Sequence, residues 1–244
     1  MASPPPPPTF RLADGIGVAR CEDSVIVLDV PCDRYRKVGG EAAVALLEIA
    51  NSRRVDPDHA GLAALHRAGF IADRLQSDAP YLDPRSIPLP TSSVLEGGAP
   101  FRAATRHDLG VVFDCAASRL DLRRWPLERV LRALRNARQR RSTKEIGELA
   151  RDFDMGRRLA PFRPCCLPDA LAFTRRAWRH GHDVRLVFGV KCHPFEAHCW
   201  AQIGEVVLTD PLERVLRFQP ILGSCPTGWC RKVSLRGWPP SIFW

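Results

Sequence analysis

Three residues of the kinds that carry out nucleophilic acyl transfer lie in the C-terminal half of the chain. Cys166 stands at the predicted start of a helix, His198 follows 32 residues later, and Asp210 follows after 12 more. A helix N-terminus favours the thiolate form of a cysteine through its dipole and its free backbone N–H groups. An imidazole takes and returns the proton of such a nucleophile, and a carboxylate fixes the tautomer of the imidazole. Together the three residues predict a Cys-His-Asp catalytic site.

The hairpin between His198 and Asp210 decides whether their side chains meet. The sequence predicts strands at 197–203 and 206–210, with a turn around Gly204. A three-residue loop would place His198 directly opposite Asp210 on one face, with Cβ atoms ~5 Å apart. A two-residue loop would place the two side chains on opposite faces. The chemistry therefore predicts a three-residue loop, in which Gly204 supplies the backbone of a G1 bulge.

The rest of the C-terminal half predicts helices followed by antiparallel strands, which indicates an α+β fold. An amphipathic helix begins at Pro126, and a capping-box pattern at 142–145 predicts a second helix. The Cys166 helix ends near His180, and a buried strand follows at Val184–Val190. The apolar side of the first helix consists of Leu127, Val130, Leu131, Leu134 and Ala137, and that of the second of Ile146, Leu149, Ala150 and Phe153.

The N-terminal half predicts a small sheet followed by helices. Strands are expected at Ile16–Arg20, Ser24–Val30 and Asp33–Val38, because these runs combine β-branched and apolar residues between polar turns. Helices are expected at Glu41–Ala50 and at Pro57–Ala68, the second with Asp56 as its N-cap. This order of elements indicates a small winged-helix module.

Composition narrows the class of protein. The chain has 244 residues, of which 45% are hydrophobic and 26% charged, as in globular domains. No apolar run approaches the ~20 residues that span a bilayer, and the N-terminus lacks the apolar stretch of a secretory signal. We therefore expect a cytoplasmic protein with no membrane partner. The nine cysteines are then expected to be thiols rather than a disulfide framework.

Charge is distributed unevenly. Residues 1–80 carry nine basic and eleven acidic side chains, whereas residues 81–244 carry 27 and 16. The segment Arg119–Arg141 alone contains nine arginines. Its simplest interpretation is a solvated helix face, and the alternative is a docking surface for an acidic partner. The remaining cysteines lack the paired spacing of zinc ligands, so no metal site is expected.

These patterns divide the chain into four parts. Residues 1–9 are expected to be a disordered Pro-rich tail, residues 10–80 a small domain, and residues 81–109 a linker rich in Pro and Gly. Residues 110–244 are expected to form the catalytic domain.

The catalytic half resembles a known family through four ordered motifs. They are Cys166-Leu167-Pro168-x-x-Leu171, Leu186-Val187-x-Gly189-Val190, Pro194-Phe195-x-Ala197-His198-x-Trp200, and Asp210. Through them the segment 155–222 resembles the lasso-peptide maturation proteases, the B proteins of lasso-peptide gene clusters. These belong to the transglutaminase-like, papain-like cysteine-protease superfamily.

The resemblance implies that Cys166 is the nucleophile, His198 the base and Asp210 the orienting acid. Cys165 is the alternative nucleophile, but the family has Leu directly after its catalytic cysteine, which favours Cys166. Where the family has a Ser- or Ala-rich continuation, this chain has Asp169-Ala170, a departure that we expect to matter little.

The N-terminal half resembles the peptide-recognition element of ribosomally made, modified peptides, a winged-helix module that binds a leader peptide as an added strand. The edge strand would be Asp33–Val38, flanked by the helix Pro57–Ala68. A DNA-binding winged helix is the alternative, and the slightly acidic charge of this half argues against nucleic acid as a partner. The expected leader-binding residues are Asp33, Arg34, Tyr35, Arg36, Lys37, Val38, Leu62 and Leu65.

The resemblance also implies two partners: a lasso-peptide precursor and an ATP-dependent, asparagine-synthetase-like cyclase that receives the core peptide. The chain has no G-x4-G-K-[ST] loop, so ATP is expected to be used by the cyclase, and no cofactor is expected here. Two alternatives stay open: a transglutaminase or amidase of the same superfamily, and a non-catalytic peptide or nucleic-acid adaptor.

Overall fold

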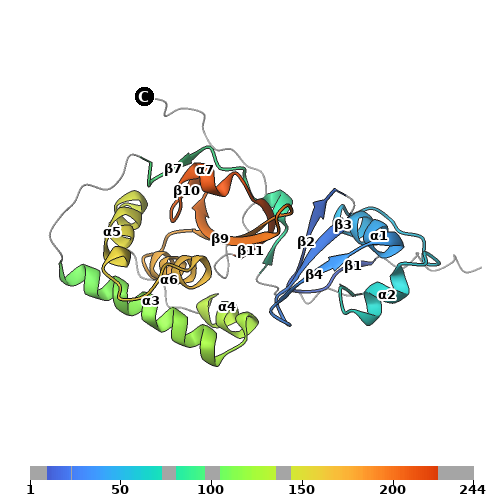
Figure 1. Ribbon diagram of the computed structural model, residues 1–244, viewed down its shortest axis with the longest axis horizontal. Helices are drawn as coiled ribbons and strands as arrows, with labels where there is room; N and C mark the ends of the chain where they lie inside the picture. The colour runs from blue at the N-terminus through green and yellow to red at the C-terminus, as the bar shows by residue number, and fades with distance from the viewer. Residues whose placement is uncertain (1–9, 23, 73–80, 97–104, 136–143, 225–244) are drawn as a thin grey trace, which may run out of the picture.

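The structure is a computed structural model that describes residues 10–22, 24–72, 81–96, 105–135 and 144–224 (Figure 1). Helices and sheets are mixed, in agreement with the α+β prediction. The N-terminal half contributes β1 (Arg11–Leu12), β2 (Ile16–Cys21), β3 (Ser24–Asp29), β4 (Arg34–Val38), α1 (Gly40–Ala50), α2 (Leu62–Arg67) and β5 (Ile71–Ala72).

The C-terminal half supplies the remaining elements. They are β6 (Tyr81–Leu82), the 3-10 helix η1 (Pro84–Ser86), β7 (Ser92–Ser93), α3 (Arg106–Arg124), α4 (Leu127–Arg135), α5 (Ile146–Arg158), α6 (Cys166–Arg179), β8 (Arg185–Lys191), β9 (Glu196–Ile203), β10 (Val206–Val207), α7 (Leu212–Val215) and β11 (Gln219–Ser224).

The N-terminal domain is built on an antiparallel sheet in the order β2-β3-β4, which confirms the three predicted strands. The helix α1 is also confirmed. The second helix is shorter than predicted, because Asp56 caps a local turn: its side chain accepts the backbone N–H of Asp58 at 3.0 Å. Helix α2 begins only at Leu62. The winged-helix assignment stays a prediction.

Successive side chains of a strand point to opposite faces, and in β3 both faces are buried. Val25 and Val27 face a core shared with α1 and α2. Ile26 and Leu28 belong to a second core, which consists mostly of residues of the C-terminal domain. The N-terminal sheet is therefore sandwiched between its own helices and the C-terminal domain. Contact is close at Gly17, where a Cβ would lie 2.5 Å from the Ile221 carbonyl oxygen.

A disulfide joins the two domains. It connects Cys21, the last residue of β2, with Cys192, which directly follows β8, and their Cα atoms are 5.8 Å apart. The expectation that all nine cysteines are thiols is therefore wrong for this pair. Cys32, Cys115, Cys165, Cys166 and Cys199 are free.

The C-terminal domain contains a six-stranded sheet in the order β6-β11-β8-β9-β10-β7. Its pairs are antiparallel except that β7 runs parallel to β10. Both edge strands, β6 and β7, come from the segment that composition assigned to a linker. Residues 81–96 are thus tied to the sheet at both ends rather than forming a free connection, because Tyr81–Leu82 pair with β11 and Ser92–Ser93 pair with β10.

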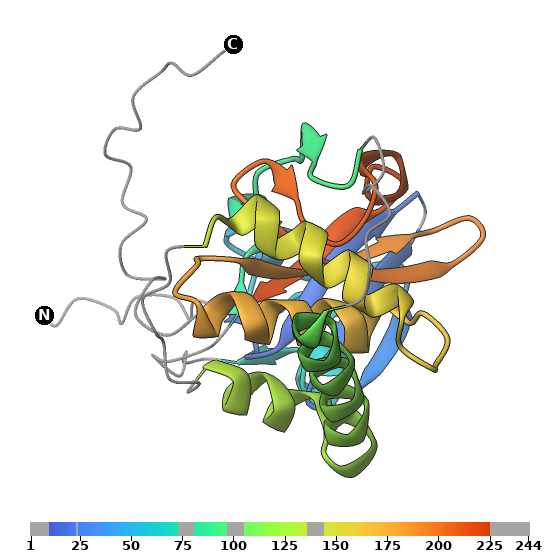
Figure 2. The same ribbon diagram turned by 90° about the vertical axis from the view of Figure 1, so that its left-hand side faces the viewer.

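Helix α6 lies between α3 and the sheet (Figures 1 and 2). Apolar periodicity does not reveal α3, because this helix buries Asp108 and Asp114 and exposes Leu109 and Phe113. Asp114 is compensated by Arg176 and Arg179 of α6, at 2.7 and 2.5 Å. A capping box of Thr105 and Asp108 starts α3.

The two predicted amphipathic helices exist as α4 and α5. Four of the five expected apolar residues of α4 are buried, and Ala137 lies outside the described residues. Helix α5 starts with Glu145 as its N-cap, so the predicted capping box is misplaced: its first residues, Ser142 and Thr143, precede the described segment. Among the described residues, no helix is long and apolar enough to cross a bilayer.

Candidate active site

Cys166 is the first residue of α6, as predicted. The N-cap is Cys165, whose extended backbone (φ −144°, ψ 123°) ends the preceding loop. Cys166 is half-buried and faces a pocket together with His198 and Asp210. The structure therefore brings the three predicted catalytic residues together.

His198 and Asp210 form the innermost pair of the site. Nε2 of His198 lies 3.0 Å from Oδ1 of Asp210, and the two side chains are only 3% and 12% exposed. The imidazole stacks over Trp200 at 6.1 Å between ring centroids and contacts the Phe218 ring at 5.0 Å. Because the sheet pairs His198 with Gly189, no side chain on β8 separates the imidazole from these rings. Aromatic packing and the carboxylate thus fix the imidazole plane.

The hairpin that carries this pair differs from the prediction. Val206 pairs with Ile203, so the loop has two residues, Gly204 and Glu205, and not three. Continued as a strand, this register would direct His198 and Asp210 to opposite faces. They still meet because β10 ends at Val207 and the chain bends before Asp210.

Thr209 and Ser93 hold Asp210 in place after the bend. The Thr209 hydroxyl accepts the Ala201 backbone N–H at 3.0 Å and donates to Oδ2 of Asp210 at 3.0 Å. The Ser93 hydroxyl of β7 donates to the Asp210 backbone carbonyl at 2.7 Å. Neither residue belongs to the site that the sequence predicts. The only local signal is that Thr209 directly precedes Asp210, whereas Ser93 lies 117 residues away.

The pKa shifts indicate a thiolate–imidazolium pair. Burial acts to raise the pKa of the Cys166 thiol, but the hydrogen bond and charge of His198, with backbone N–H groups of Cys199 and Leu167, outweigh it and lower the pKa. Burial acts to lower the pKa of His198, but the hydrogen bonds and charges of Asp210 and Cys166 raise it to about 9. Since Nε2 faces Asp210, the contact with Cys166 falls to Nδ1.

Cys165, the alternative nucleophile, lacks this environment. It is exposed, and its pKa is raised by partial burial and by the neighbouring Cys166 and Asp169. The pKa of Cys165 is thus shifted away from the thiolate and that of Cys166 toward it, which favours Cys166 as the nucleophile. Within the described segments, no cluster of His, Cys, Asp or Glu is arranged to hold a metal ion.

Asp169, which we expected to matter little, organises the loop before the nucleophile. Its Oδ2 accepts the Cys165 backbone N–H at 2.9 Å. Arg119 of α3 and Arg157 of α5 each approach this carboxylate to 2.8 Å, Arg157 as an ion pair without an aligned hydrogen bond. Arg119 and Arg157 also contact Phe162, with guanidinium–ring distances of 4.3 and 5.4 Å. Three helices thereby clamp the segment that leads to Cys166.

The arginine stripe is solvated at Arg123, Arg124, Arg129 and Arg132, as its simplest interpretation predicts, but its first residue departs from this pattern. Arg119 is 18% exposed and is committed to Asp169. Arg129 lies 3.5 Å above the Trp125 ring, at the break between α3 and α4. The part of the stripe at 136–143 lies outside the described residues.

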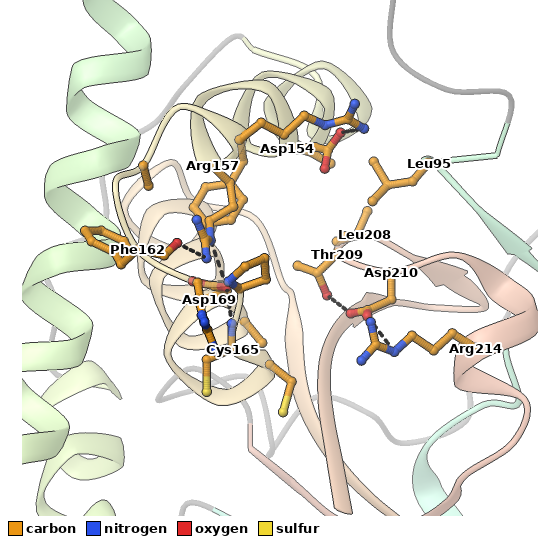
Figure 3. Close-up of a pocket in the computed structure, with 18 of the residues that line it drawn as sticks. Leu95, Asp154, Arg157, Phe162, Cys165, Asp169, Leu208, Thr209, Asp210 and Arg214 are labelled. Carbon is orange, nitrogen blue, oxygen red and sulfur yellow. Dashed lines mark hydrogen bonds and ion pairs between the residues drawn. The ribbon is translucent and has the colours of Figure 1, made fainter.

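A pocket of about 650 Å³ opens in front of the catalytic residues (Figure 3). One wall is the clamped segment 160–166, and the opposite wall is formed by Leu208, Thr209 and Asp210. Thr209 and Asp210 lie across the pocket from Cys165 and Phe162 in Figure 3. The pocket is large enough for several residues of an extended peptide.

Strand β4 of the N-terminal domain reaches the vicinity of the nucleophile. The Tyr35 ring packs edge-on against Phe195 at 5.7 Å, three residues before His198. Burial, followed by the charges of Cys199 and Cys166, raises the pKa of Tyr35. One end of the N-terminal sheet is therefore close to the catalytic cysteine.

The expected leader-binding residues fall into two groups. Those of the 33–38 segment lie on β4 or just before it, and β4 pairs only with β3 within the described part of the chain. Arg34 and Lys37 are exposed, whereas Arg36 approaches Asp29 at 3.5 Å. Leu62 and Leu65 are 4% and 1% exposed and lie in the core under the sheet. Leu62 and Leu65 would thus contribute to a peptide site by supporting the sheet from inside the domain.

The comparisons with known proteins define the class of the catalytic half. Residues 109–223 match the family model described as the transglutaminase-like superfamily. This segment contains Cys166, His198 and Asp210, so the chain carries a transglutaminase-like domain. The superfamily usually contains cysteine proteases or acyltransferases. No curated protein and no solved structure matches the chain.

Proposed function

We propose that this protein is a cysteine endopeptidase that removes the leader from a lasso-peptide precursor. The observation that carries the proposal is the Cys166–His198–Asp210 arrangement, in which a thiol of lowered pKa contacts an imidazole held by a carboxylate at 3.0 Å. The transglutaminase-like match over residues 109–223 supports the reaction class. The leader substrate and the cyclase partner rest on the family resemblance, and the proposed cytoplasmic location rests on the sequence pattern alone.

The chemistry follows from the geometry of the three residues. The Cys166 thiolate attacks the carbonyl carbon of the scissile peptide bond and forms a tetrahedral intermediate. His198 donates its Nδ1 proton to the leaving nitrogen, and the C–N bond breaks to free the core amine. Water, deprotonated by His198, then attacks the thioester and releases the leader acid. Asp210 stabilises the imidazolium throughout. Backbone N–H groups at the start of α6 are suited to bind the oxyanion.

The N-terminal domain fits a role in substrate delivery. A leader that adds a strand to the open edge of β4 would be held by backbone hydrogen bonds and by Arg34 and Lys37. Tyr35 places this edge beside Phe195 and the catalytic cysteine. The disulfide between Cys21 and Cys192 and the shared core fix the distance between the two sites. This arrangement favours cleavage at a set distance from the bound leader.

Mass spectrometry of a leader–core precursor incubated with the protein tests the proposal. We expect two products whose masses sum to that of the precursor plus one water. Cys166→Ala should abolish cleavage and retain leader binding, measured by fluorescence anisotropy of a labelled leader. Cys165→Ala is the matched control and should retain turnover. Turnover by Cys166→Ala would refute the assigned nucleophile.

Acyl transfer is the second candidate, because the superfamily match covers both reaction types. The thioester formed by Cys166 reacts with an amine in a transglutaminase and with water in a protease. Loss of ammonia with crosslinking of the precursor, in place of addition of water, would establish this activity and exclude leader removal. If the protein is a non-catalytic adaptor, neither the addition of water nor the loss of ammonia should be observed.

A further inference from the structure

The walls of the active-site pocket carry more cations than their own carboxylates neutralise. The cationic lining residues, apart from His198, are Arg157, Arg158, Arg163 and Arg214. The anionic ones are Asp154, Asp169 and Asp210. Which arginines keep free N–H donors depends on how these groups pair.

Two of the arginines are committed. Arg157 pairs with Asp169, which also binds Arg119 from α3. Arg158 pairs with Asp154 one turn earlier on α5, at 2.7 Å. These two arginines therefore neutralise carboxylates of the pocket itself.

The other two keep unused donors. Arg163 is exposed, and its guanidinium makes no hydrogen bond or ion pair with any residue in the part of the chain that the structure describes. Arg214 of α7 is 60% exposed and lies 3.9 Å from Oδ1 of Asp210, an oxygen that already binds His198. Arg214 lies across the pocket from Cys165 in Figure 3, whereas Arg163 precedes Cys165 by two residues. Arg214 thus keeps N–H donors available on the wall across from Cys165, and Arg163 lines the same pocket two residues before Cys165.

We propose that this pocket binds a carboxylate of the peptide substrate close to the scissile bond, with Arg163 and Arg214 as the specificity-determining residues. A guanidinium offers a planar fork of N–H donors that matches a carboxylate, and partial enclosure strengthens such a contact. No described residue of the N-terminal domain lines the pocket, so the contact is separate from leader binding at β4. The proposal rests on the proposed function only in taking a peptide as the ligand.

Alkylation of Cys166 tests the charge preference without requiring cleavage. Iodoacetate and iodoacetamide attack the same thiolate but differ by one negative charge. Site-resolved mass spectrometry gives the rate of each at Cys166, and their ratio cancels changes in the thiolate fraction. We expect Arg163→Gln and Arg214→Gln each to lower the iodoacetate-to-iodoacetamide ratio by about threefold to tenfold, as for a charge several ångströms away in a partly enclosed site.

Arg151→Gln is the matched control, since this exposed arginine of α5 does not line the pocket. It should leave the ratio unchanged. A ratio that falls equally in all three variants, or in none, overturns the proposal. If the ratio responds as expected but no precursor is cleaved, the proposed function fails and the carboxylate site stands. If cleavage is found and the ratio does not respond, the carboxylate site fails and the proposed function stands.

Protection by short peptides distinguishes the source of the carboxylate. The probes are Ac-Ala-Asp-Ala-amide, Ac-Ala-Asn-Ala-amide and Ac-Ala-Ala-Ala as the free acid, each tested for slowing the reaction of Cys166 with iodoacetamide. Protection by the Asp peptide alone indicates a side-chain carboxylate, and protection by the free acid indicates a chain terminus. Equal protection by all three, or by none, contradicts carboxylate recognition. In either supporting case Arg163→Gln should abolish the difference.

Discussion

Nε2 of His198 lies 3.0 Å from Oδ1 of Asp210, although the hairpin register would direct their side chains to opposite faces. The contact exists because β10 ends after two residues. The Thr209 hydroxyl, and not a backbone carbonyl, then accepts the Ala201 backbone N–H, and the chain bends so that Asp210 returns toward His198. The geometry of the candidate site therefore depends on a break in the sheet, and we expect residues that hold this break to matter for the proposed activity.

The charges of Cys166 and His198 predict different pH profiles for two reactions. Cleavage should fall as pH rises through about 9, because the imidazolium that protonates the leaving nitrogen is lost. Alkylation by iodoacetamide needs only the thiolate and should not fall there. The rates of both reactions should fall in acid, with an apparent pKa below the ~8.5 of a free cysteine. This apparent pKa belongs to the Cys166–His198 pair and not to either residue alone. Cys166 alkylation that titrates near ~8.5 would contradict the ion pair.

Thr209→Val should lower kcat by about tenfold to a hundredfold and leave KM nearly unchanged. The substitution removes the hydroxyl that donates to Oδ2 of Asp210, and a hydrogen bond to a charged group contributes ~1.5–3 kcal/mol. Steady-state kinetics on the precursor measures the split. Thr209→Ser keeps the hydroxyl and should retain most of the activity. Equal losses for Ser and Val would show that the hydroxyl is not responsible.

Gly189→Ala should destabilise the protein by about 1–3 kcal/mol and slow alkylation of Cys166. A Cβ at this position would lie 2.6 Å from the Trp200 ring, which must then shift under His198. Urea unfolding and alkylation rates provide the two measurements. Gly110→Ala is the matched control: the nearest atom to its Cβ is 3.6 Å away on the Arg176 side chain. Within α3 it should be neutral or stabilise by up to about 1 kcal/mol.

Asp169→Ala should destabilise the protein by about 3–5 kcal/mol, because it leaves the Arg119 and Arg157 guanidinium groups in partly buried positions without their carboxylate. Urea unfolding measures the loss. Asp154→Ala breaks a pair whose arginine is 60% exposed and should cost less than about 1 kcal/mol. Similar effects for the two variants would contradict a structural clamp at Asp169.

The Cys21–Cys192 disulfide predicts a link between redox state and stability. Peptide mapping without reductant should recover these two residues as one crosslinked pair. Closing a loop across a sequence separation of 171 should contribute about 2–5 kcal/mol, so reductant should lower the thermal unfolding midpoint. In the double variant Cys21→Ser with Cys192→Ser, reductant should have no further effect. Alkylation of both thiols in the unreduced protein would contradict the bond.

Some elements of the fold can be predicted from local sequence pattern and others cannot. The β-branched run at 24–30 and the apolar positions of α4 and α5 are correctly predicted, because burial on one or two faces leaves a periodic trace. Helix α3 has no such apolar periodicity, since it buries Asp114, whose charge is compensated by arginines from α6. The short edge strands β6 and β7 likewise acquire their structure from β11 and β10.

Local sequence pattern is enough to predict the Cys, His and Asp of the candidate site, their order, and the helix and strand that present Cys166 and His198. It does not show how Asp210 reaches His198, that Asp169 holds the loop before Cys166, or that β4 comes close to the site. The difference lies in the range of the interactions. Propensity and periodicity act over a few residues, whereas these contacts join groups as far apart as Arg119 and Asp169, whose positions only the packed core fixes.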